Sequence, residues 1–161
     1  MSISSPDGDG SPLHGHAVIA GFGVPGRAIA DALASQHIPF VVIELNPTTV
    51  DRCAHIGLHI ISGDVRDEQT LRQAGIEHAR FFAVTVPDDP TALAAVRAAR
   101  RLNATIPIMA RFHFISNGME AHRIGANEVI IEEKVVAQEF LRMIESNSSL
   151  LPAPPVPQAH R

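Results

Sequence analysis

Six short apolar segments alternate with helix-like segments along the middle of the chain, and this alternation limits the possible folds more than any other feature. Each segment has four to six residues and is apolar on both faces, which is typical of strands that are buried on both sides. We predict strands at 16–20, 40–43, 58–61, 81–86, 106–110 and 128–131. Strands that alternate with helices in this way favour a parallel sheet with helices on both faces.

The segments that follow the strands carry helix signals, which are clearest in the fourth. There Asp89 is a suitable N-cap, Pro90 suits the first turn, and apolar residues recur at helical spacing. We predict helices at 24–36, 48–55, 67–74, 89–102, 114–124 and 132–145. Short right-handed crossovers then give an α/β, Rossmann-like, doubly wound fold, with a six-stranded parallel sheet in three layers, α/β/α.

The predicted domain covers residues 15–146 of the 161. Residues 1–14 are rich in Ser, Gly, Pro and Asp, so we expect a flexible leader or linker, and the proline-rich residues 147–161 should form a disordered tail. The sequence shows no secretory signal and no apolar run of the roughly 18–20 residues that a membrane span needs. We therefore expect a cytoplasmic domain without direct membrane insertion.

Composition excludes several classes of function. A net charge of −4 gives no general attraction to nucleic acid, and a single cysteine, Cys53, cannot form a disulfide framework within the chain. His55 and His59 are four residues apart but fall on different predicted elements, so we expect no metal site. The chain has no Tyr to act as a general acid and no G-x-S-x-G motif, and we expect no catalytic residues.

A glycine-rich loop directly follows the first predicted strand and opens the first helix. Its residues are Gly21, Phe22, Gly23, Val24, Pro25 and Gly26, a G-x-G-x-x-G pattern. In this context Gly21 permits a tight turn, Gly23 lets a phosphate approach the backbone, and Gly26 lets the helix pack on the strand. The positive end of the helix dipole then favours an anion, so the loop predicts a phosphate-binding site.

Pro25 stands in this loop where a backbone N–H would otherwise meet phosphate, and proline has none. Arg27 follows Gly26 and either restores positive charge near the loop or points to solvent. With one backbone N–H donor fewer, the loop offsets less of the negative charge of a ligand that has several phosphates. We therefore expect AMP or NAD(H) to bind at least as well as ATP.

Polar residues at the ends of later strands complete the candidate site. Glu44 ends the second predicted strand, 18 residues after Gly26, where a carboxylate accepts hydrogen bonds from both ribose hydroxyls and repels a 2′-phosphate. It therefore favours NAD over NADP, or an adenine mononucleotide; alternatively it is a solvated strand-end carboxylate. Asp64 ends the third strand and either accepts from the adenine amino group, with the Val65 backbone at the ring edge, or makes an Asx turn or helix cap.

Two further residues fall on the rim of the same crevice. Thr85 ends the fourth predicted strand and Arg111 the fifth. Arg111 either meets a phosphate or an acidic ligand, or is an ordinary surface arginine.

Several motifs in the same order resemble the TrkA-N family, the regulator-of-potassium-conductance (RCK) domains. They are the glycine loop, Ile43-Glu44-Leu45-Asn46-Pro47 and Ser62-Gly63-Asp64-Val65-Arg66-Asp67, followed by motifs at 81–89, 108–111 and 125–130. The resemblance covers about residues 15–146 and is closest to the cytosolic domains of Kef- and YbaL-type cation:proton antiporters. It implies ligand contacts at Gly21, Gly23, Gly26, Glu44, Asp64 and Arg111, and we include Leu45, next to Glu44, in the candidate set.

This resemblance also implies a function. Domains of this kind bind AMP, ADP/ATP or NAD(H), pair as dimers, and gate a membrane cation transporter that is attached or a separate chain. The family often has Arg where this chain has Val24, which again points away from extended phosphate chains. We therefore expect a regulatory nucleotide-binding module at the cytosolic face of a membrane, and not an enzyme.

Two other functions stay open at this stage. A small NAD-dependent oxidoreductase would need a substrate pocket and a proton donor, whereas the nucleotide-binding fold uses nearly the whole chain. A free-standing adenine-nucleotide sensor would act without a transporter.

The last two predicted helices hold more apolar residues than packing on one side of a sheet requires, and leftover apolar surface marks an interface. These residues are Phe112, Phe114, Ile115, Met119 and Ile124, followed by Val135, Val136, Phe140, Leu141, Met143 and Ile144. We predict a homodimer, which the resemblance also implies; alternatively, the tail after Ser146 covers this surface.

Overall fold

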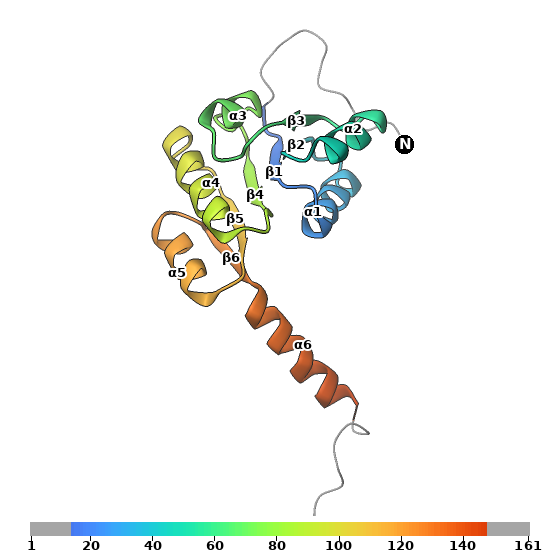
Figure 1. Cartoon of the computed structure of the whole chain (residues 1–161), viewed down its shortest axis with the longest axis vertical. Coiled ribbons are helices and arrows are strands. Elements are labelled where there is room, and N and C mark those ends of the chain that lie inside the picture. The colour runs from blue at the N-terminus through green and yellow to red at the C-terminus, as the bar shows by residue number, and fades with distance from the viewer. Residues whose placement is uncertain (1–13, 148–161) are drawn as a thin grey trace, which may run out of the picture.

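The computed structural model describes residues 14–147, and it forms the predicted doubly wound fold (Figure 1). The elements are β1 (Ala17–Ala20), α1 (Val24–Ser35), β2 (Phe40–Glu44), α2 (Pro47–His55), β3 (Ile60–Ser62), α3 (Glu68–Gln73), β4 (Phe81–Val84), α4 (Asp89–Leu102), β5 (Ile108–Phe112), α5 (Ile115–Arg123), β6 (Glu128–Ile131) and α6 (Glu132–Ser146). All strand pairs are parallel, and the strand order is β3-β2-β1-β4-β5-β6. The expected leader and tail lie outside the described residues, apart from His14 and Asn147.

The strands differ from the predicted ranges by at most two residues, and β5 shows why. It was predicted at 106–110 but spans Ile108–Phe112. Pro107 has no N–H for the ladder, so it contributes only its carbonyl, which accepts from the Phe82 N–H. The shift places Arg111 inside β5, one residue before its end.

Two apolar cores lie on opposite faces of the sheet and give the three predicted layers. Alternate residues of β1 point to different cores: Val18 packs with α3, α4 and α5 residues, and Ile19 packs with α1 and α2 residues. The second core includes Cys53, which is buried as a small apolar residue; burial raises the pKa of its thiol and keeps it protonated.

α6 belongs to neither core. It begins at the residue that follows β6, has no buried residue, and projects away from the domain (Figure 1). No loop separates the strand from the helix, so α6 does not turn back over the sheet. On the α1 side of the sheet, Met109 and Arg111 of β5 are therefore only partly buried and Ile130 of β6 is exposed.

A buried histidine at the amino end of β1 is a feature that the sequence analysis did not anticipate. His16 is fully buried, and its Nε2–H donates to the Ala74 carbonyl at 2.8 Å. Its Nδ1 has no hydrogen-bond partner among the described residues. Burial lowers the pKa of His16, so the neutral ring is the form that the fold stabilises.

Candidate functional site

The glycine loop makes the turn from β1 into α1, and it requires glycine at one position for the backbone angle and at another for lack of space. Gly21 has a φ of +89°, which L side chains rarely adopt. A Cβ on Gly26 would lie 2.1 Å from the Gly21 carbonyl oxygen. These are the tight turn and the close helix packing predicted for the two glycines.

Gly23 differs from its two neighbours in the motif because nothing occupies the space beside it. It is the N-cap of α1, no side chain caps the helix there, and the nearest atom to an added Cβ would be Cδ of Pro25 at 4.0 Å. The first N–H groups of a helix have no partner within it. The start of α1 is therefore open to an anion, with Pro25 in the first turn as the one position without a donor.

Glu44 joins the glycine loop to the loop after β2. Its Oε2 accepts from the Phe22 N–H at 2.8 Å, while its Oε1 accepts from the N–H groups of Leu45 at 2.8 Å and Asn46 at 2.9 Å. A carboxylate has about four acceptor positions, so three are already occupied. The sequence predicted a carboxylate free to accept hydrogen bonds from both ribose hydroxyls. The structure places Glu44 at the predicted edge of the sheet, but to bind both hydroxyls it must share or give up one of its hydrogen bonds from backbone N–H groups.

Asp64 is also engaged, by the residue two positions later. Its Oδ1 accepts from the Arg66 N–H at 2.9 Å, and its Oδ2 pairs with the Arg66 guanidinium at 2.6 Å. This is the Asx-type turn weighed as the alternative, and the hydrogen bonds from Arg66 lower the pKa of Asp64. Val65 is buried in the core on the α3–α5 side, whereas Leu45 is exposed.

Thr85 directly follows β4 and bonds the backbone where the glycine loop begins. It is buried, and its hydroxyl lies 2.8 Å from the Ala20 carbonyl oxygen and 2.9 Å from that of Gly21, to which it donates. Thr85 lines the cavity described below, and its hydroxyl is occupied by the backbone of the loop.

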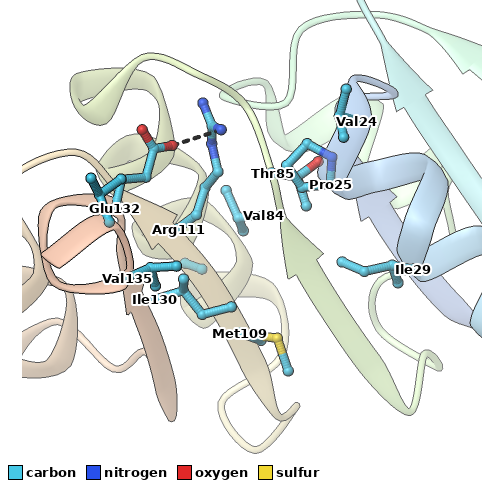
Figure 2. A pocket seen from close by; sticks show the side chains of 12 residues that line it. Val24, Pro25, Ile29, Val84, Thr85, Met109, Arg111, Ile130, Glu132 and Val135 are labelled. Atoms are coloured by element: carbon cyan, nitrogen blue, oxygen red, sulfur yellow. Dashed lines mark ion pairs between the residues drawn. The ribbon is translucent and has the colours of Figure 1, made fainter. Parts of the chain in front are cut away.

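A cavity of about 400 Å³ lies between α1 and the start of α6, over the part of the sheet that no helix covers (Figure 2). Its lining is mainly apolar: Val24, Pro25, Ile29, Val84, Thr85, Met109, Ala110, Arg111, Ile130, Glu132, Val135 and Val136. The volume falls in the range of about 300–1,000 Å³ typical of small-molecule sites. Four of the predicted site residues line this cavity, namely Val24, Pro25, Thr85 and Arg111. Glu44 and Asp64 do not line it, because they lie on the other side of the glycine loop, toward β2 and β3.

Arg111 reaches the rim of this cavity and is paired there. Its Nη1 lies 2.7 Å from Oε1 of Glu132, and its Nε donates to the Val86 carbonyl at 3.3 Å. Oε2 of Glu132 lies 2.8 Å from Nδ1 of His113. Glu132 was not among the predicted site residues. It directly follows β6, at the carboxyl edge of the sheet where Glu44 and Asp64 were found, so a search for polar residues at strand ends would have identified it.

The apolar surface predicted on the last two helices is present, with a correction. Phe112 is fully buried and Ile124 packs against the core, so neither contributes. The other nine of those residues are large, exposed apolar side chains: Phe114, Ile115 and Met119 at α5, and Val135, Val136, Phe140, Leu141, Met143 and Ile144 on α6.

An all-parallel sheet in this order, with a glycine loop after β1 and a carboxylate at the end of β2, defines a Rossmann-type domain with nucleotide-binding geometry. The TrkA-N domain model matches residues 17–132, and the chain belongs to the TrkA-N family, as its motifs predicted. Within residues 14–147, no group of three or more His, Cys, Asp or Glu side chains could hold a metal ion. In the same part of the chain, no helix has both the length and the apolar character to cross a membrane.

Two of the similar relatives are named as antiporters. The putative cation/proton antiporter YbaL of Escherichia coli is 31% identical over 131 residues, which cover 81% of this chain and 24% of YbaL. The putative K(+) efflux antiporter KefB of Alkalimonas amylolytica is 31% identical over 134 residues, which cover 81% of this chain and 20% of KefB. This chain therefore spans about a quarter or less of the length of these two relatives.

Solved structures agree with the fold and with this family. The crystal structure of the TrkA-N domain of YbaL from Escherichia coli has a TM-score of 0.79 at 30% identity, over 83% of this chain and 99% of that one. The GsuK channel bound to NAD has a TM-score of 0.65 at 26% identity, over 80% of this chain and 23% of the channel.

Proposed function

We propose that this chain is a regulatory module that binds an adenine nucleotide, AMP or NAD(H), at the carboxyl edge of its sheet. One observation carries the proposal: Glu44 is hydrogen bonded to the Phe22 N–H, so the ribose-binding carboxylate and the glycine loop form one preorganised unit. The open start of α1 beside Gly23 supplies the place for phosphate.

The choice of ligand follows from charge and from donors. Glu44 disfavours a 2′-phosphate, which argues for NAD(H) over its phosphorylated form. Pro25 removes a donor and Val24 brings no charge, so ADP and ATP can bind but gain less from their additional phosphates. The NAD-bound GsuK relative supports the dinucleotide. For NAD(H), the mainly apolar cavity beside Arg111 would take the nicotinamide half.

The binding event should act on a transporter. YbaL and KefB are antiporters of which this chain matches a minor part, so we place the module at the cytosolic face of a membrane, on a cation transporter that is attached or a separate chain. The exposed apolar residues of α5 and α6 fit a homodimer interface. The two copies of the dimer could then adopt two arrangements, and a nucleotide would shift the equilibrium toward the arrangement that it binds more tightly. In this proposal the chain regulates and does not catalyse.

The test is mass spectrometry of small molecules released from the purified protein, followed by an assay of NADH consumption. We expect AMP, NAD or NADH among the released molecules and no turnover of NADH with candidate substrates. A defined substrate that is reduced at the expense of NADH would replace the regulatory module with the small oxidoreductase.

A further inference from the structure

We propose that Glu132 is a built-in competitor for the anion site at Arg111, and that a nucleotide phosphate must displace it to bind fully. The inference rests on the proposed function and adds its regulation: displacement of Glu132 loosens the start of α6. The phosphate is recognised as an anion by the guanidinium, as the Glu132 carboxylate is in the free protein.

Arg111 is held ready for an anion in the cavity. Its backbone is fixed in β5, and its Nε donates to the Val86 carbonyl, which orients the guanidinium at the rim. Figure 2 shows Arg111 and Glu132 on one side of the cavity and Val24 and Pro25 of the glycine loop on the other. A phosphate on the loop therefore faces the ion pair across one shared space.

Glu132 and a phosphate cannot both form a well-aligned ion pair with the single guanidinium of Arg111. Glu132 already uses both oxygens, one for Arg111 and one for His113. A phosphate is negatively charged like the Glu132 carboxylate, so a phosphate that approaches Arg111 repels Glu132. The ion pair is only partly exposed, with 21% of the Arg111 side chain and 29% of the Glu132 side chain accessible, so this competition is less screened than at an open surface.

Displacement matters because Glu132 is the first residue of α6 and anchors it. Its ion pair with Arg111 and its contact with Nδ1 of His113 join the helix to the end of β5 and to the residue after it. Within residues 14–147, no other ion pair links α6 to the rest of the chain, and no α6 residue is buried. Loss of the Glu132 contacts would therefore free the helix that carries six of the nine exposed apolar residues of α5 and α6.

The test compares AMP with adenosine, which has the same base and ribose but no phosphate, by calorimetric titration. For Glu132→Gln we expect AMP to bind about three- to tenfold tighter than to the wild type, because a partly buried competitor for Arg111 is removed. Adenosine affinity should stay within about twofold. Glu133→Gln is the matched control, with the same charge change one residue further along α6, and should leave both affinities within about twofold.

Two further comparisons use Arg111 itself and the unmodified protein. In an Arg111→Gln background, Glu132→Gln should no longer tighten AMP binding. In the wild type, AMP but not adenosine should increase amide hydrogen exchange over residues 132–136, a readout that needs no substitution.

Each outcome decides between the two proposals. AMP binding that Glu132→Gln leaves unchanged or weakens, or tightening that adenosine shares equally, overturns the competition and leaves the nucleotide-binding function intact. Failure of the wild type to bind AMP, adenosine and NAD overturns the proposed function, and the competition with it. Unchanged exchange at 132–136 on AMP binding overturns the release of α6.

Discussion

Gly26→Ala tests whether the glycine loop is as tightly packed as the structure indicates. The new Cβ would lie 2.1 Å from the Gly21 carbonyl oxygen and 3.0 Å from the Thr85 hydroxyl oxygen. An ordinary contact needs about 3.4 Å, so α1 or the loop must move by roughly 1 Å, and the Thr85 hydrogen bonds that hold the loop must stretch. Overpacking at a backbone oxygen should cost about 2–4 kcal/mol of unfolding free energy.

The assay is thermal unfolding by circular dichroism, combined with AMP titration. For a domain of this size the cost corresponds to a fall of roughly 6–15 °C in Tm, and AMP binding should weaken because the loop that receives the phosphate has shifted. Gly23→Ala is the control, since its added Cβ meets nothing closer than 4.0 Å and its φ is −72°. It should keep the wild-type Tm within about 2 °C and still weaken AMP binding, because its Cβ covers the phosphate approach.

The two variants together separate stability from binding. A Gly26→Ala protein with wild-type Tm would refute the close packing of α1 on the loop. A Gly23→Ala protein with wild-type affinity for AMP would refute the placement of phosphate beside Gly23.

Four other predictions concern Glu44, the loop proline, His16 and the apolar surface of α5. Glu44→Ala should weaken AMP and NAD binding by about 1–3 kcal/mol in calorimetric titration, since charge-assisted hydrogen bonds to ribose are lost; equal affinities would remove Glu44 from the site. The wild type should bind AMP or NAD(H) at least as tightly as ATP, and an ATP affinity about tenfold above that of AMP would contradict the argument from the loop proline. Burial lowers the pKa of His16 in the folded state below its ordinary value of 6.5. As the pH falls through 6.5, the unfolded chain therefore takes up a proton at His16 before the folded chain does, and the free energy of unfolding should decline. Burial also lowers the pKa of His59, so His59 contributes to the same decline. The measurement is therefore the free energy of unfolding in urea from pH 7.5 to 5, compared between wild type and His16→Gln. Parallel curves for the two proteins would count against His16. Light scattering should report twice the chain mass, reduced by Phe114→Glu or Met119→Glu; a persistent monomer, or a dimer that neither change affects, would remove α5 from the interface.

The alternation of apolar segments predicted the fold because it reflects burial on both faces, and that requirement is local to each strand. The strand positions were less accurate where a single backbone group decided them, as at Pro107 before β5. The apolar face of α6 was recognised from its sequence, yet periodicity carries no information about what covers such a face. Its projection from the domain depends on the direct junction after β6, which only the structure shows.

The candidate site was predicted in its position more than in its contacts. Strand ends located Glu44, Asp64 and Arg111 at one edge, because parallel strands bring their carboxyl ends together. What each side chain holds depends on geometry that spacing alone does not determine. The bond from Phe22 to Glu44 spans 22 residues, and the pair of Arg111 with Glu132 joins the end of β5 to the start of α6.

Selective recognition of an adenine nucleotide through Glu44 and the glycine loop is the central claim about this protein. Calorimetric titration of the wild type with AMP, NAD and NADP measures it in one experiment. We expect saturable binding of AMP or NAD with one ligand per chain, and NADP binding at least about tenfold weaker than NAD, because the 2′-phosphate of NADP meets the Glu44 carboxylate. No binding of AMP or NAD at millimolar concentration, or equal affinities for NAD and NADP, would contradict it.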